Sequence, residues 1–171
     1  MKFVFLTDIY GISEHVELIA KRLGGDVSFI SPYERESEIP NNKDAVYEYF
    51  HSVSSIEKYT QKVRCALEYV DYSVMLVGFS IGATVGWRIS GDSHFPIRNS
   101  ICIFGSRIRD YLNVKPIRPI SLFFSNDEKY FINKLEYSDW ITIELVNCAH
   151  SAISEPNGCN IAVRLINKAL R

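Results

Sequence analysis

The 171-residue sequence lacks both an excess of charge of one sign and a long apolar run. Its formal net charge is −1 and no like-charged block occurs, so neither nucleic acid nor an anionic membrane surface is an expected partner. No apolar run approaches the ~18 residues of a membrane-spanning helix. The opening MKFVFLTDIYG loosely resembles a secretory signal, but Thr7 and Asp8 interrupt its short apolar part, which favours a strand.

The motifs of disulfide and metal chemistry are also missing. The four cysteines show no CxxC spacing, which favours reduced thiols in a cytoplasmic protein: Cys65, Cys102, Cys148 and Cys159. No two of the four histidines have the spacing of metal ligands, so we expect neither a metal nor a cofactor. With 47% apolar and 23% charged residues, the composition predicts one ordinary globular domain over residues 1–171.

Short apolar segments alternate with helical patterns along the chain. The expected strands are Phe3–Leu6, Val27–Ile30, Tyr72–Val77, Ile101–Phe104, Ile120–Phe124 and Ile141–Val146. The expected helices follow the cap Ser13, span Asp44–Val70 with a point of division at serines 52, 54 and 55, and cover Ile81–Ile89, Glu128–Tyr137 and Asn157–Leu170. This alternation predicts an α/β fold, a mostly parallel six-stranded sheet with helices on both faces.

One stretch, LVGFSIGATVGW (residues 76–87), places Ser80 between Gly78 and Gly82 where a buried strand gives way to a helix. A sharp turn there strains the central residue and needs small neighbours, and it exposes the central hydroxyl at the sheet edge. Ser80 is therefore the candidate nucleophile. The alternative is a structural glycine turn with no chemistry.

A serine needs a base to take its proton, and His150 is the one histidine that follows both Ser80 and a strand end. The acid that orients the histidine is expected between the two in the chain. Asp127, just past the fifth strand, is the candidate acid, and the adjacent Glu128 is a second choice.

An acyl-transfer site must also hold an oxyanion with backbone N–H groups. Ile81, at the start of the helix after the nucleophile, supplies one candidate donor, and Ile9, in the loop after the first strand, supplies the other. Tyr10 beside that loop is a candidate pocket residue, with surface packing as the alternative. Arg107, after the fourth strand, could reach the rim of the site and bind an acidic group of the substrate. The alternative is a solvated charge in a loop.

Three segments together resemble the α/β-hydrolase superfamily and, more narrowly, the dienelactone hydrolase family: TDIYG (7–11), VGFSIGA (77–83) and AHSA (149–152). The resemblance implies Ile9 as an oxyanion donor and places Asp8 near the nucleophile. It also implies a minimal three-layer fold with strand order 2-1-3-4-5-6. Ser80 stands where dienelactone hydrolase itself has cysteine, and Ser154 stands where that enzyme has a carboxylate-binding arginine, which argues against a dienelactone substrate.

The residues and the resemblance together predict a serine hydrolase that cleaves a small ester or thioester through an acyl-enzyme. The alternative is a non-catalytic binding or regulatory module on the same scaffold, and peptidase activity is a weaker third. No segment is long enough for a large lid, so we expect an open site bounded by residues 31–43 and 105–119.

Overall fold

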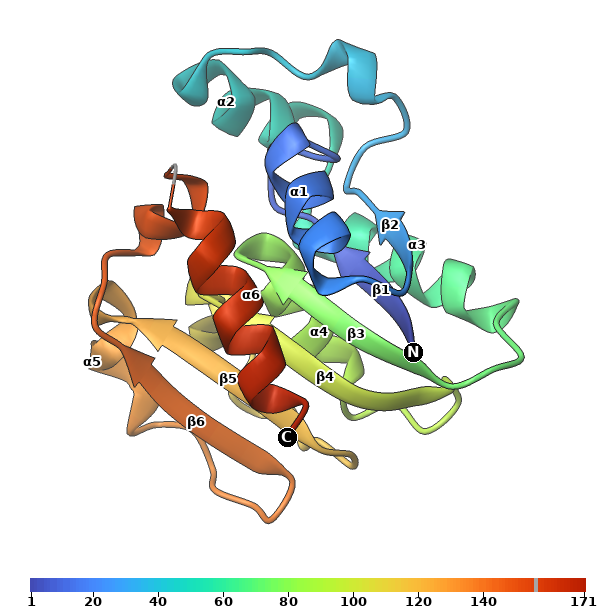
Figure 1. Ribbon diagram of the computed structural model, residues 1–171, viewed down its shortest axis with the longest axis vertical. Coiled ribbons are helices and arrows are strands. Elements are labelled where there is room, and N and C mark those ends of the chain that lie inside the picture. Colours follow the sequence, from blue (N-terminus) through green and yellow to red (C-terminus); the bar gives the residue numbers. More distant parts are fainter. Residues whose placement is uncertain (156) are drawn as a thin grey trace.

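The computed structural model describes residues 1–155 and 157–171 and contains one six-stranded sheet (Figure 1). All neighbouring strands are parallel, in the order β2-β1-β3-β4-β5-β6. The strands are β1 (Lys2–Leu6), β2 (Asp26–Ile30), β3 (Val74–Phe79), β4 (Ile97–Ile103), β5 (Ile120–Ser125) and β6 (Ile141–Val146). The predicted fold class and strand order are confirmed.

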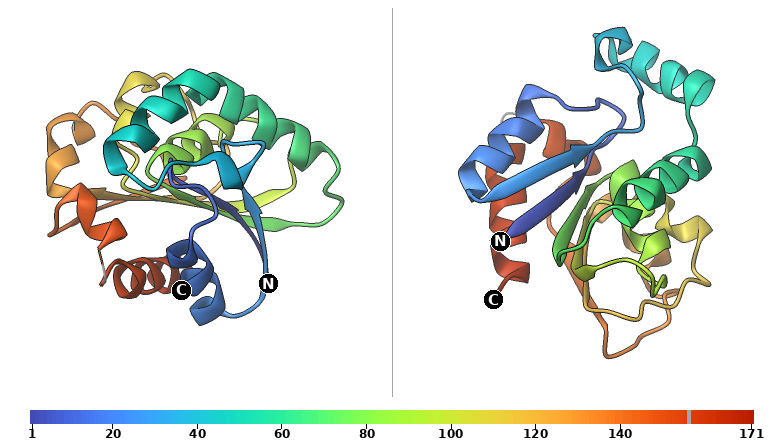
Figure 2. Two further views of the ribbon diagram at one scale, coloured as in Figure 1. Left: turned by 90° about the horizontal axis from the view of Figure 1, so that it is seen from above. Right: turned by 90° about the vertical axis from the view of Figure 1, so that its right-hand side faces the viewer.

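Helices cover both faces of the sheet, which gives three layers (Figure 2). The helices are α1 (Glu14–Leu23), α2 (Lys43–Val53), α3 (Ile56–Glu68), α4 (Ile81–Ile89), α5 (Lys129–Ile132) and α6 (Gly158–Ala169). Helices α1 and α6 pack together on one face, and α3, α4 and α5 lie on the other. Short 3-10 helices lie in several of the connections: η1 (Glu36–Glu38), η2 (Ser106–Asp110), η3 (Asn126–Glu128) and η4 (His150–Ser154). No helix in the described part of the chain is both long and apolar enough to cross a bilayer.

Polar caps fix the helix boundaries that the sequence pattern predicted. The Ser13 side chain accepts a hydrogen bond from the Val16 N–H and starts α1. The long helical pattern after residue 43 divides at the serine cluster: Ser54 ends α2, and the Ser55 side chain accepts from the Lys58 N–H to start α3.

Two boundaries differ from the sequence prediction by four residues or more. Strand β4 begins at Ile97, four residues before the predicted start. Helix α5 ends at Ile132 instead of continuing to Tyr137, because the next residues form tighter turns with hydrogen bonds to the third residue back. The N–H groups of Lys134 and Leu135 donate to carbonyls three residues back, and the Leu135 side chain is buried.

Candidate active site

Ser80 occupies the turn between β3 and α4 in a strained backbone conformation. Its φ is +50° and its ψ is −108°, a region that L-residues rarely adopt. The Ser80 N–H donates to the Ile103 carbonyl at 2.9 Å, and the buried β3 and α4 on either side hold the turn. The surrounding packing therefore keeps the Ser80 side chain at the carboxyl edge of the sheet.

The two glycines that flank this turn allow backbones to approach closely. A Cβ on Gly78 would lie 2.5 Å from the Gly82 carbonyl oxygen, and a Cβ on Gly82 would lie 2.2 Å from the Leu6 carbonyl oxygen. Neither contact is sterically possible without moving buried backbone. The small residues of the motif are thus required by the approach of α4 to β3 and β1.

His150 reaches the serine from the other end of the chain. It is the first residue of η4, after β6, and its Nε2 lies 3.1 Å from the Ser80 Oγ. The imidazole lies 6.1 Å from the ring of buried Phe104, centroid to centroid, and its side chain is about one-third exposed. The predicted nucleophile and base are therefore within hydrogen-bond reach.

The carboxylate that faces the other imidazole nitrogen comes from Glu128. Its Oε1 lies 3.3 Å from His150 Nδ1, and the Glu128 side chain is only 2% exposed. Its Oε2 accepts from the Ser125 backbone N–H at 2.7 Å and from the Ser125 hydroxyl at 3.0 Å. These bonds hold the carboxylate inward.

Asp127, the first choice from sequence, lies elsewhere. The Asp127 side chain is exposed, and its Oδ2 accepts from the His150 backbone N–H at 2.8 Å instead of facing the imidazole. The physical reason is the capping box of η3, in which Ser125 and Glu128 bond reciprocally and turn Glu128, not Asp127, inward. The pattern Ser-x-x-Glu at 125–128 is the sequence signal that indicates this choice.

The two residues expected to supply oxyanion donors, Ile9 and Ile81, border the same site. Ile81 is the first residue of α4, so its N–H is one of the donors that a helix leaves free. Ile9 lies in the loop after β1, and both residues line the pocket that contains Ser80 and His150. Within residues 1–155 and 157–171, neither amide has a hydrogen-bond acceptor. Both amides are therefore available to bind an oxyanion.

The pocket at Ser80 has a volume of about 560 Å³. Helix α2 lines one side with Tyr47, Phe50 and His51, and η2 lines another with Arg107 and Arg109. The predicted boundary at 105–119 is confirmed, but the one at 31–43 is wrong because α2 takes that place. Sequence analysis missed the α2 residues, although positions 47, 50 and 51 share one helical face.

Arg107 stands at this rim in an ion pair. Its Nε donates to Asp110 Oδ2 at 2.5 Å, and this bond raises the pKa of the guanidinium. Arg109 lies within 3.7 Å of the same carboxylate and donates to the Ser106 carbonyl. Two guanidinium groups therefore share one carboxylate, which leaves this side of the pocket positively charged.

Asp8 and Tyr10 are not among the residues that line this pocket. Asp8 Oδ1 accepts from the Tyr10 N–H at 2.8 Å, and Asp8 lines a separate cavity of about 20 Å³ with His15 and Phe79. Burial raises the pKa of Asp8 from 3.8 to about 6, against the opposing effects of the Tyr10 N–H and the nearby His150. Asp8 thus lies near His150 and in the same loop as Ile9, but it does not line the pocket at Ser80.

No three His, Cys, Asp or Glu side chains of residues 1–155 and 157–171 are grouped to hold a metal ion. The groups that the site presents for chemistry are the Ser80 hydroxyl, the His150 imidazole, the Glu128 carboxylate and two backbone amides.

The fold matches solved structures over nearly the whole chain, so this is an α/β-hydrolase-fold protein. A Klebsiella pneumoniae protein assigned to the dienelactone hydrolases matches with a TM-score of 0.73 at 11% identity, over 99% of this chain and 84% of that chain. Mouse alpha/beta hydrolase domain-containing protein 10 matches with a TM-score of 0.67 at 12% identity, over 99% of this chain and 89% of that chain.

At the level of sequence the chain is similar to YczH, an uncharacterized protein of Bacillus subtilis. The two are 30% identical in an alignment 139 residues long, and the alignment covers 72% of this chain and 63% of YczH. The match thus spans less than two thirds of that relative. No protein-family model matches the chain.

Proposed function

We propose that this protein is a serine hydrolase that cleaves a small ester or thioester through an acyl-enzyme on Ser80. The observation that carries the proposal is the 3.1 Å approach of Ser80 Oγ to His150 Nε2, with Ser80 held at a strained strand-to-helix turn. A structural glycine turn needs no imidazole at its serine. The buried carboxylate of Glu128 behind the imidazole further supports catalysis.

The first half-reaction forms the acyl-enzyme. Ser80 Oγ attacks the acyl carbon while His150 Nε2 takes the hydroxyl proton. Glu128 accepts from Nδ1–H, which sets the tautomer that leaves Nε2 unprotonated and stabilises the imidazolium as it forms. The carbonyl oxygen becomes an oxyanion between the N–H groups of Ile9 and Ile81. Collapse of this intermediate breaks the bond to the leaving alcohol or thiol, which takes the proton from His150.

The second half-reaction releases the acid. Water enters the vacated leaving-group position and gives a proton to His150 Nε2 as its oxygen attacks the acyl carbon. The same two amides hold the second oxyanion. Breakage of the bond to Ser80 Oγ returns the proton to the serine and frees the carboxylic acid.

The pocket supports a small substrate. Its volume of about 560 Å³ falls in the range of small-molecule sites, and Ile9, Phe50 and Ile56 give it an apolar part near the nucleophile. The likeness to a protein assigned to the dienelactone hydrolases supports placing the chain near that family. Ser154 in place of an arginine argues for a different ester from the dienelactones.

Turnover of p-nitrophenyl acetate by the wild-type protein and Ser80→Ala tests the proposal. We expect hydrolysis by the wild type and a loss on the order of 10³-fold or more in the variant, because removing the nucleophile removes the acyl-enzyme route. Circular dichroism checks that both proteins fold. A folded wild type that turns over neither short-chain oxygen esters nor thioesters favours the non-catalytic binding module instead.

A further inference from the structure

We infer that Tyr33 is a positioning residue, whose hydroxyl aims the Ile9 oxyanion donor by clamping the loop that carries it. The inference rests on the proposed function. The Tyr33 hydroxyl donates to the Ile9 carbonyl at 2.6 Å, across 24 positions of sequence. Tyr33 lies outside the pocket at Ser80, so it acts through Ile9 and does not touch the substrate.

The Ile9 N–H belongs to the Asp8–Ile9 peptide plane, and that plane is held more firmly when the next plane, Ile9–Tyr10, is also held. The Asp8 carbonyl accepts from the Gly11 N–H at 3.2 Å and from the Thr7 hydroxyl at 3.3 Å. In a trans peptide the carbonyl and the next N–H point in opposite directions. Holding the Asp8 carbonyl on one side therefore directs the Ile9 N–H to the other.

The following peptide plane is held at both ends. Its carbonyl, that of Ile9, accepts from the Tyr33 hydroxyl, and its N–H, that of Tyr10, donates to the Asp8 carboxylate at 2.8 Å. With the planes on both sides of Ile9 fixed, the backbone dihedrals of Ile9 have little freedom. Of these bonds, the one from Tyr33 is the only one that comes from outside the loop 7–11.

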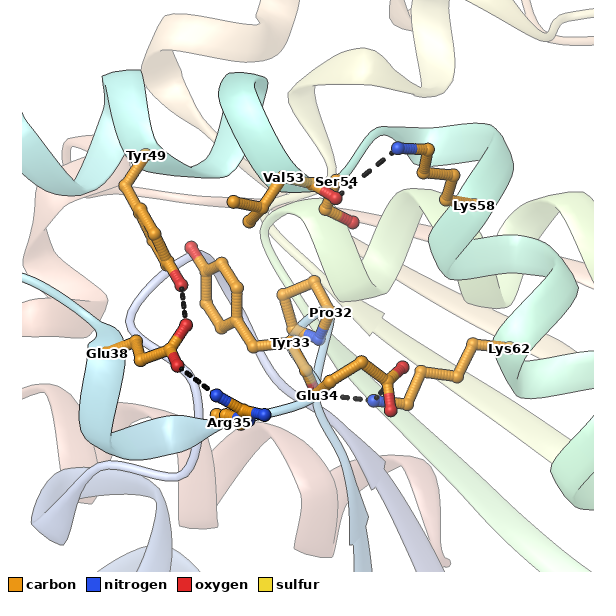
Figure 3. A pocket seen from close by; sticks show the side chains of 10 residues that line it. All are labelled: Pro32, Tyr33, Glu34, Arg35, Glu38, Tyr49, Val53, Ser54, Lys58 and Lys62. Atoms are coloured by element: carbon orange, nitrogen blue, oxygen red, sulfur yellow. Dashed lines mark hydrogen bonds and ion pairs between the residues drawn. The ribbon is translucent and has the colours of Figure 1, made fainter.

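The Tyr33 ring is itself immobilised by α2. It is 4% exposed, its ring centroid lies 5.4 Å from that of Tyr49, and the Phe50 ring meets it edge-on at 6.5 Å. Figure 3 shows the Tyr33 and Tyr49 rings side by side at the wall of a separate pocket, with the Tyr49 hydroxyl bonded to Glu38. Lys62 also bonds the Tyr33 carbonyl.

The Tyr33 hydroxyl also remains a hydrogen-bond donor at neutral pH. Burial raises the pKa of Tyr33 above its usual 10, so the hydroxyl stays protonated and continues to donate. Phe50 contacts Tyr33 and lines the pocket at Ser80 as well. Tyr33 thus links the packing of α2 to the loop 7–11 that carries Ile9.

Tyr33→Phe tests the inference, with Tyr49→Phe as the matched control. The first keeps the ring and removes the hydroxyl that holds Ile9, and the second removes a neighbouring hydroxyl that bonds only exposed Glu38. For p-nitrophenyl acetate we expect kcat to fall about 10-fold in Tyr33→Phe, less than the 10²–10³ for outright loss of a donor. KM should stay within about twofold, since the oxyanion forms only after binding.

Two further readouts separate positioning from general damage. A trifluoromethyl ketone, which forms an anionic hemiketal on the serine, should bind Tyr33→Phe more weakly by the same factor as the fall in kcat. Hydrogen exchange of the peptide covering residues 7–12 should be faster in Tyr33→Phe and unchanged in Tyr49→Phe. The exchange measurement does not depend on activity.

Failure of the inference about Tyr33 can be told apart from failure of the proposed function. A wild-type protein without hydrolysis rejects the proposed function. An active wild type whose Tyr33→Phe variant keeps kcat within twofold, or loses kcat without weaker ketone binding, rejects only the role of Tyr33.

Discussion

His150 Nδ1 lies 3.3 Å from the Oε1 of buried Glu128, while the neighbouring Asp127 bonds only the backbone N–H of His150. This relationship predicts that Glu128→Gln lowers kcat on p-nitrophenyl acetate by about 10²–10⁴-fold, since the neutral amide neither sets the tautomer nor stabilises the imidazolium. Asp127→Asn keeps an acceptor oxygen for the backbone N–H and should stay within about threefold of wild type. Steady-state kinetics of both variants decides between the two carboxylates, and a larger loss in Asp127→Asn contradicts the assignment.

The choice between these two acids illustrates where sequence reasoning stops. The helix boundary at Ser55 and the turn at Ser80 follow from local patterns, since periodicity, capping and steric demands act over a few residues. The strand order instead came from the family resemblance. Whether residue 127 or 128 faces the imidazole depends on a one-residue rotation in a 3-10 turn. Only the local signal Ser-x-x-Glu bears on it.

The pocket walls are the less predictable part of the site. Helix α2 is amphipathic, so its buried face is evident from spacing, but its packing over the carboxyl ends of the strands is a long-range matter. The same holds for Tyr33, which the sequence shows only as an aromatic residue in a polar loop. Its bond to the Ile9 carbonyl depends on two loops meeting in space.

Gly82→Ala should destabilise the protein by about 3 kcal/mol or more. Its Cβ would lie 2.2 Å from the Leu6 carbonyl oxygen, in buried backbone that has no room to yield. Gly86→Ala on the same helix is the control: its Cβ would lie 3.3 Å from the Cys102 Sγ, and we expect a change within about 1 kcal/mol because alanine favours the helix. Urea unfolding measures both, and an unchanged midpoint for Gly82→Ala would contradict the close approach of α4 to β1.

Asp8 should make the folding stability depend on pH. Its folded-state pKa is raised from 3.8 to about 6, so the neutral carboxyl is favoured in the fold. Its contribution is fully present below about pH 4 and is lost as the pH rises through 6. Asp8→Asn stays neutral, so its stability relative to wild type should increase by up to about 3 kcal/mol between pH 4 and pH 8. Urea unfolding across this range tests the point; parallel curves for the two proteins would refute it.

Arg107 should favour substrates that carry a negative charge away from the scissile bond. At the η2 rim, Arg107 and Arg109 share the carboxylate of Asp110. The other carboxylate of the pocket, Glu57, pairs with Arg88 and accepts from the Tyr111 hydroxyl. Arg107→Gln should lower kcat/KM about 3- to 10-fold for p-nitrophenyl hemisuccinate and less than twofold for the neutral p-nitrophenyl butyrate. Arg35→Gln, which alters an exposed pair with Glu38 outside this pocket, is the control. Equal effects of Arg107→Gln on the two esters would show that Arg107 does not bind the charged group of the substrate.

The most direct measurement is the reaction of the folded protein with a fluorophosphonate, followed by peptide mass spectrometry. An activated serine displaces fluoride and keeps the phosphonyl group, whereas an ordinary serine does not react at a comparable rate. We predict one adduct, on Ser80, that is lost on denaturation before labelling and forms much more slowly in His150→Ala. An unlabelled Ser80 in folded protein across several such probes, or labelling that survives the loss of His150 undiminished, would contradict it.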